Sequence, residues 1–265
     1  MSAKIITMTS GKGGVGKTTA VANIAVALAS NGAKVCCIDG DIGLRNLDVV
    51  MGLENRIVYD IVDVIEGRCR LRQAMIRDKR VPELYLIPAA QTRDKSAVSP
   101  SDMIRLGEEL REEVDWVLID SPAGIERGFR NAIAAADHAL VITNPEVSAV
   151  RDADRVIGLL EAEEKGSPSL IINRLNPTMV KNHDMLSSED VIDLLAIRLI
   201  GIVPEDETVL VGTNRGTPIV LEPKSMAGQA FRNIAQRLQG QDVPFMDLDN
   251  SGSLWARIQR MAGRR

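Results

Sequence analysis

The residues from Gly11 to Thr18 have the types and the spacing that binding of nucleotide phosphates requires. They read GKGGVGKT and fit the pattern G-x-x-x-x-G-K-[ST]. Glycines let the backbone turn its N–H groups toward phosphate oxygens. The Lys17 side chain is expected to bridge the β- and γ-phosphates, and the Thr18 hydroxyl to bind Mg²⁺. The segment therefore predicts a phosphate-binding loop.

Acidic residues at the ends of two apolar runs could complete this chemistry. Phosphoryl transfer chiefly needs a positioned water, and Asp41 is expected to orient it. Asp39 could serve the Mg²⁺ shell instead, and Asp120, which ends the run WVLID, should bind Mg²⁺ through water. The Gly124 N–H could swing toward the γ-phosphate, so that ATP and ADP would order this segment differently. Taken alone, Asp39 or Asp41 would more often be a turn or helix-cap residue.

The elements that must position these residues are short apolar strands alternating with helical patterns. The expected strands are 4–9, 34–39, 84–88, 116–120, 139–143, 169–173 and 199–203. The expected helices are 17–30, 101–114, 125–135, 148–165, 189–196 and 225–238. This alternation predicts one α/β domain over residues 1–239, a three-layer P-loop NTPase with a mostly parallel twisted sheet flanked by helices. Ligands of such sheets bind beyond the carboxyl ends of the strands.

A second lysine inside the loop, Lys12, has no evident role in a simple phosphate cradle. With it, residues 12–19 read KGGVGKTT, and on this motif the chain resembles the deviant Walker A (MinD/ParA) family of ATPases. The resemblance implies Mg²⁺-dependent hydrolysis of ATP to ADP and phosphate, with Lys12, Lys17 and Asp41 as catalytic residues. It also implies that Lys12 reaches the phosphates held by the partner subunit of an ATP-dependent homodimer. The expected nucleotide contacts within the loop are Gly11, Lys12, Gly13, Gly14, Val15, Gly16, Lys17, Thr18 and Thr19.

Four further segments resemble the division-site branch of that family. They are DGDIGLRNLD at 39–48, DSPAGIE at 120–126, NPEVSAVRDADR at 144–155 and IVPEDE at 202–207. The resemblance implies that Asn173 and the segment from Pro204 to Asp206 frame the adenine, and that Glu146 lies at the dimer face near the partner's nucleotide. It also implies recruitment of the division inhibitor MinC and, where present, stimulation by MinE. Asn173 as a turn residue and Glu146 as a solvated helix-start acid are the alternatives.

The C-terminal residues differ in kind from the rest of the chain. Residues 240–252 are polar and acidic and are expected to form a linker, and 253–265 contain four arginines and no acid. A helix over 253–265 would separate an apolar side from a basic one, which is typical of an amphipathic helix lying on anionic lipid. The expected membrane contacts are Leu254, Trp255, Arg257, Ile258, Arg260 and Met261. A terminal helix docked on the core is the alternative.

Composition narrows the function classes. With 32 basic and 36 acidic residues the net charge is −4, so the chain lacks the basic field of a general DNA binder and no direct DNA binding is expected. A ParA-like DNA-partition ATPase is for this reason only an alternative reading. A flagellar-number regulator ATPase is another alternative. No run approaches the roughly 18 apolar residues of a transmembrane helix. The chain is expected in the cytoplasm and, peripherally, on the cytoplasmic side of the inner membrane.

Overall fold

The central layer of the molecule is one twisted sheet. In the computed structural model, which describes residues 3–248, eight strands pair in the order β3-β4-β2-β5-β1-β6-β7-β8. Neighbouring strands are parallel, except that β3 runs antiparallel to β4 at the edge. The strands are β1 Lys4–Thr9, β2 Val35–Asp39, β3 Ile76–Arg77, β4 Leu84–Ile87, β5 Trp116–Asp120, β6 His138–Thr143, β7 Ser169–Leu175 and β8 Arg198–Pro204.

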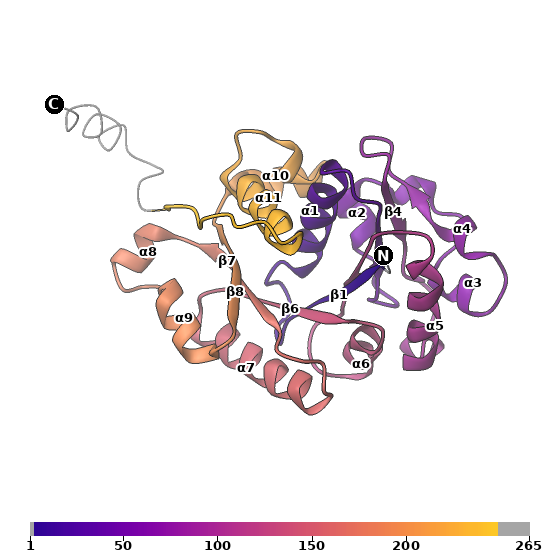
Figure 1. Ribbon diagram of the computed structural model, residues 1–265, viewed down its shortest axis with the longest axis horizontal. Coiled ribbons are helices and arrows are strands. Elements are labelled where there is room, and N and C mark those ends of the chain that lie inside the picture. Colours follow the sequence, from indigo (N-terminus) through magenta and orange to yellow (C-terminus); the bar gives the residue numbers. More distant parts are fainter. Residues whose placement is uncertain (1–2, 249–265) are drawn as a thin grey trace.

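Helices cover both faces of this sheet (Figure 1). The longer ones are α1 Lys17–Ser30, α5 Pro100–Arg111, α6 Arg127–Ala134, α7 Val147–Ala162, α9 Ser188–Leu195, α10 Glu207–Asn214 and α11 Met226–Leu238. The shorter ones are α2 Leu47–Met51, α3 Ile61–Ile65, α4 Leu71–Ala74 and α8 Pro177–Lys181, with 3₁₀ turns η1 Glu54–Arg56, η2 Lys95–Ala97 and η3 Ile219–Leu221. The three-layer α/β fold expected from the sequence is confirmed.

The core lies on both sides of the sheet because successive strand residues point to opposite faces. Ile6 and Met8 pack with α1 and α11 on one face, whereas Ile5 packs with α5 on the other. A third apolar cluster lies under α7 and α9, against β6 and β7. Few aromatic residues are needed, since Ile, Leu, Val and Ala side chains fill these layers.

The predicted strands and helices are confirmed to within three residues at each end. Start signals explain part of this accuracy: Ser99 caps α5 ahead of Pro100, and Ser187 caps α9 in a reciprocal bond with Asp190. Sequence reasoning missed α2, α3, α4, α8, α10 and β3. Most of these have two to five residues, which is too short for periodicity to distinguish them from loops.

The described residues also bear on the C-terminal predictions. Residues 241–248 form neither helix nor strand, yet Met246 and Leu248 pack against the domain, so the first part of the predicted linker lies on its surface. The predicted membrane helix, 253–265, and residues 249–252 lie outside the described residues. Within residues 3–248, no helix is both long and apolar enough to cross a bilayer.

Candidate functional site

The phosphate-binding loop joins the end of β1 to the start of α1. Gly14 and Gly16 adopt left-handed backbone conformations, with φ of 77° and 98°, which only glycine enters at little cost. Gly16 is the N-cap of α1, so the positive end of that helix opens onto the loop. Lys17 is 8% exposed, and its Nζ donates to the Ser10 hydroxyl at 2.9 Å. Lys17 therefore lies inside the loop, as its predicted phosphate role requires.

Close packing around the loop explains two of its glycines. A Cβ on Gly11 would lie 2.1 Å from the carbonyl oxygen of Asp152 in α7, and one on Gly16 would lie 2.4 Å from Asn173 Nδ2. Asn173 donates from Nδ2 to the Val15 carbonyl at 2.7 Å. The sequence predicted Asn173 as an adenine contact. The structure gives it a position beneath the loop, where it fixes the backbone of Val15.

Two carboxylates face each other where the strands end. Asp39 and Asp120 are opposite one another in the register of β2 and β5, and both are buried. Burial raises the pKa of Asp120 to about 8 and that of Asp39 to about 6, and the negative charge of Asp39 adds to the effect on Asp120. The Thr18 hydroxyl hydrogen-bonds to Asp120. The sheet therefore places a polar, acidic cluster directly below the phosphate-binding loop.

Asp39 and Asp120 use their oxygens differently. Asp39 accepts the backbone N–H of Asp41, Asn46 and Leu47, each at 3.0 Å. It thereby pins the loop of residues 40–46, called here the first switch segment. Asp120 Oδ1 is buried and has no hydrogen-bond partner among residues 3–248. This oxygen and the Thr18 hydroxyl form a donor set of the hard oxygen type that Mg²⁺ prefers.

The donor set fits a magnesium ion that also binds phosphate and water, since Mg²⁺ is usually held by one or two protein oxygens. No cluster of three or more His, Cys, Asp or Glu side chains able to hold a metal occurs in the described part of the chain. Asp120 and Thr18 are thus the residues that would hold Mg²⁺. The Asp39 oxygens accept hydrogen bonds from backbone N–H groups. The role of Asp39 in the Mg²⁺ shell stays a prediction.

Asp41 lies in the first switch segment with one oxygen unpaired. Its side chain is about half buried, which raises its pKa, while the positive charges of Lys95 and then Lys17 oppose the rise. Asp41 Oδ1 is buried without a hydrogen-bond partner in the range 3–248. A carboxylate with a free acceptor beside Lys17 could take the proton of a bound water or hold that water in place.

The second switch segment, residues 121–124, touches the same loop. Gly124 has φ 87° and donates its N–H to the Ser10 carbonyl at 3.3 Å. A Cβ at Gly124 would meet nothing within 4 Å. Its backbone thus has space around it. The predicted movement of this N–H toward a phosphate would require it to release the Ser10 carbonyl.

Lys12 points away from Lys17, to the surface. Its side chain is 43% exposed, and Nζ contacts Ser148 Oγ at 3.1 Å and Glu146 Oε2 at 3.5 Å. Glu146 precedes α7 and is itself 51% exposed. The structure therefore brings these two predicted dimer-face residues together at an open rim of the loop, within one subunit. Ser148 was not predicted, although it lies within the segment NPEVSAVRDADR at 144–155.

Pro204 and Asp206 lie at the end of β8 and line an open groove of about 920 Å³ with residues of α10 and η3. Asp206 caps α10 by accepting the Thr208 N–H at 2.9 Å, and also accepts the Ser225 hydroxyl at 2.8 Å. Its carboxylate thus joins α10 to the start of α11. The groove has the size of a small-molecule site, and the adenine role of Pro204 and Asp206 stays a prediction.

Sequence reasoning missed two polar residues near this site. Ser10, directly before the loop, accepts from Lys17 and donates to the Lys12 carbonyl at 2.7 Å. Its place next to the motif is a signal that could have been used. Lys95 lies in η2, more than fifty residues after Asp41 in the sequence. No spacing rule identifies it, because only the fold brings it to Asp41.

Comparison with known proteins identifies relatives over nearly the whole chain. Residues 6–219 match the CobQ/CobB/MinD/ParA nucleotide binding domain. A septum site-determining protein MinD from Synechocystis sp. is 55% identical over 259 residues, covering 97% of each chain. The MinD of Bacillus subtilis is 52% identical over 263 residues, covering 98% of each chain.

Solved structures agree with these relatives. MinD in a MinC:MinD cell division protein complex from Aquifex aeolicus superimposes with a TM-score of 0.87 at 50% identity, covering 92% of this chain and 99% of that one. A septum site-determining MinD from Pyrococcus horikoshii, complexed with Mg-ADP, has a TM-score of 0.81 at 30% identity and covers 89% and 96% of the two chains.

Proposed function

The chain belongs to the septum site-determining MinD group of the CobQ/CobB/MinD/ParA nucleotide-binding ATPases, and from this we propose that it is an ATP-dependent dimer that binds the inner membrane. The observation that carries the proposal is the opposite placement of the two lysines in one loop. Lys17 is buried in its own subunit, whereas Lys12 lies at an exposed rim beside Glu146. A second subunit can reach Lys12 there, and Lys12 can reach that subunit's nucleotide.

Within each subunit the residues divide the work of hydrolysis. The loop N–H groups and Lys17 bind the phosphates, and Asp120 with Thr18 would hold Mg²⁺, which supplies charge neutralisation at the phosphates. Asp41 orients the attacking water and accepts its proton. Asp39 keeps Asp41 in place through the backbone bonds of the first switch segment. The positively charged Lys12 of the second subunit completes each site, so that dimerisation and hydrolysis depend on one another.

Membrane binding follows from pairing two weak anchors. The sequence of 253–265 suits a basic amphipathic helix, and one such short helix binds lipid only marginally. Two on one dimer raise the avidity by about 10² to 10⁴ without any new contact. Because ATP causes dimerisation, ATP would then also cause the protein to bind the membrane peripherally. Hydrolysis would return single subunits to the cytoplasm.

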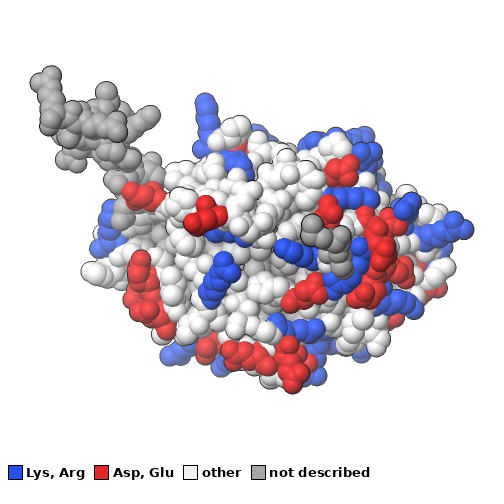
Figure 2. Space-filling model, viewed as in Figure 1, with Lys and Arg blue, Asp and Glu red and all other residues white. Residues whose placement is uncertain are grey.

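The division role would be exercised through partners at the membrane. The Aquifex aeolicus MinD structure is of a complex with MinC, and half of the residues aligned to it are identical. We propose that this chain likewise recruits MinC, and that MinE, where present, stimulates its ATPase. Lys and Arg alternate with Asp and Glu on the face shown in Figure 2, an arrangement that gives duplex DNA no continuous basic surface there.

Sedimentation with vesicles tests this proposal. The full chain is mixed with vesicles of phosphatidylglycerol and phosphatidylcholine in Mg·ATP, in Mg·ADP or without nucleotide. We expect the protein to pellet with vesicles only in ATP, and removal of 253–265 to abolish pelleting. Ile258→Asp should also abolish it, whereas Gln259→Asp, with the same change in charge on the polar side of the helix, should reduce it less. Equal pelleting in ATP and ADP would refute the switch.

A further inference from the structure

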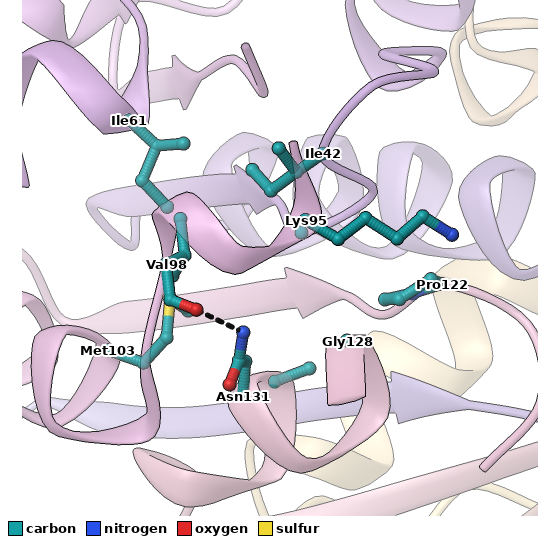
Figure 3. Close-up of a pocket in the computed structure, with 10 residues that line it drawn as sticks. Ile42, Ile61, Lys95, Val98, Met103, Pro122, Gly128 and Asn131 are labelled. Atoms are coloured by element: carbon teal, nitrogen blue, oxygen red, sulfur yellow. Dashed lines mark hydrogen bonds between the residues drawn. The ribbon is translucent and has the colours of Figure 1, made fainter. Parts of the chain in front are cut away.

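A narrow pocket lies between the two switch segments (Figure 3). It has room for about one water molecule, with a volume near 10 Å³. Gly40 and Ile42, the two neighbours of Asp41, form one wall, and Pro122 of the second switch segment forms another. The long side chain of Lys95 runs along this pocket with its ammonium group toward Pro122. Lys95 thus lines the same pocket as both segments expected to respond to ATP.

The backbone around Lys95 is firmly held. Asp94 caps the η2 turn by accepting the Ser96 N–H at 2.8 Å, and Asn131 in α6 donates from Nδ2 to the Val98 carbonyl at 2.8 Å. The same loop is joined to the first switch segment, because Gly43 donates its N–H to the Ala90 carbonyl at 2.8 Å. Lys95 is therefore presented from a fixed turn and not from a free loop.

The charges around Asp41 indicate a role for Lys95. Lys95 and Lys17 are the cations that oppose the effect of burial on the Asp41 pKa, and Lys95 is the stronger of the two. Under the proposed function, Lys17 is taken up by the phosphates when ATP binds. Asp41 then faces additional negative charge from the nucleotide, and a carboxylate is repelled from a neighbouring anion. Of these two cations, Lys95 is the one that the phosphates do not take up, and it lines the pocket beside Gly40 and Ile42, the neighbours of Asp41.

We propose that Lys95 is a positioning residue that holds the Asp41 carboxylate in place against the charge of the bound nucleotide. It acts through Asp41 and need not touch the nucleotide itself. Since it lines one pocket together with Pro122, it links the position of Asp41 to that of the second switch segment. The inference rests on the proposed role of Asp41 in hydrolysis, but not on membrane binding.

Lys95→Gln, Lys95→Met and Lys95→Arg test this role. In steady-state ATPase assays on the full chain, we expect Gln and Met each to lower kcat by about 10-fold, since misplacing a water-orienting group costs one to two orders of magnitude. KM for ATP should stay within about twofold. Arg should restore most of kcat, because it keeps the charge. Lys79→Gln, which removes an exposed lysine that belongs to neither switch segment and does not line the pocket, should leave kcat unchanged.

Each contrary result has one meaning. If Met keeps full activity while Gln loses it, the aliphatic stem and not the charge matters, and the proposal is overturned. If Gln leaves kcat unchanged, or raises KM alone, it is likewise overturned. ATP-dependent dimerisation, measured by light scattering after size exclusion, separates this failure from failure of the proposed function: the wild-type chain must dimerise and hydrolyse ATP, and Lys95→Gln must still dimerise.

Discussion

Buried carboxylates at the strand ends make the nucleotide-free protein sensitive to pH. The pKa of Asp120 is about 8 and that of Asp39 is about 6. Both values are above the ordinary aspartate pKa of about 3.9. For an acid with a raised pKa, the folded state holds more protons than the unfolded one between the two values. The stability that the protonated carboxyls contribute is therefore complete below about pH 4 and is lost as the pH rises toward 8.

Asp120→Asn should remove most of this dependence. In EDTA and without nucleotide, we expect the melting temperature of the variant to exceed that of the wild type. The difference should grow between pH 5 and pH 8 and reach about 3 °C or more, which corresponds to ~1 kcal/mol of unfolding free energy. Asp154→Asn, on the exposed side of α7, should show a constant margin. A margin that stays flat for Asp120→Asn would mean that this carboxyl is ionised throughout the range.

The two catalytic predictions separate dimerisation from hydrolysis. Lys12→Ala should abolish the ATP-dependent dimer seen by size exclusion, because the cross-subunit contact is lost, whereas Lys79→Ala should dimerise normally. An intact ATP dimer in Lys12→Ala would refute the cross-subunit role.

Asp41→Ala should produce the opposite behaviour. Without the group that orients water, hydrolysis falls by about 10² or more, so we expect a dimer that keeps ATP and stays on vesicles after wild-type protein has left. Phosphate release measured beside vesicle sedimentation checks both points. Turnover equal to that of the wild type would remove Asp41 from the mechanism.

Residues that belong to a local motif were the predictable part of the site. Lys17, Thr18 and the loop glycines are recognised by spacing, and Asp120 by its position after an apolar strand. The contacts of Asn173 with Val15 and the position of Lys95 near Asp41 join residues far apart in the chain. No local pattern encodes such contacts, because they depend on which strand ends meet at one edge of the sheet.

At the scale of elements, the phosphate-binding loop and α7 form one packed unit. Gly11→Ala would place a Cβ 2.1 Å from the Asp152 carbonyl oxygen, whereas the nearest atom to a Cβ on Gly13 is 3.8 Å away, at Ala123. We expect Gly11→Ala to destabilise the fold by about 1 to 3 kcal/mol, as overpacking does, and to weaken ATP binding. Gly13→Ala should cost less stability. Denaturant unfolding of the two variants provides the comparison, and equal losses would contradict the packing argument.

The length and the apolar pattern of an element decide whether the sequence predicts it. Helix α1 and strands β1, β2 and β5 carry long or fully apolar patterns, and their bounds were predicted closely. The four-residue α4 and the two-residue β3 have no periodicity of their own. Of α4 only Ala74 is buried, and β3 forms by antiparallel pairing with β4. Local sequence therefore predicted the frame of the sheet but not the additions at its edge.

At the scale of the whole molecule, Arg237 fastens residues 243–248 across the end of the domain. It donates to the carbonyls of Val243 and Pro244, each at 2.9 Å, and its guanidinium lies 4.2 Å from the centre of the Phe245 ring. Arg237→Ala should release residues 243–248, called here the strap. Hydrogen exchange by mass spectrometry should show faster exchange over 243–248, with the phosphate-binding loop unaffected. Arg155→Ala, an exposed arginine of α7, should change neither region, and unchanged exchange over 243–248 in Arg237→Ala would show that the strap is held otherwise.

The strap fixes where a foreign sequence can be attached. Leu248 lies at the border of two grooves, one beside Pro204 and Asp206 and the other between α8 and α9. A fluorophore, spacer or fusion inserted after Leu248 would spare every contact that Arg237 makes. The same insertion at Gly240 would disturb the contacts of Arg237 with Val243 and Phe245. A tether engineered for imaging should accordingly be attached after Leu248, where it leaves Arg237 and residues 243–245 in contact.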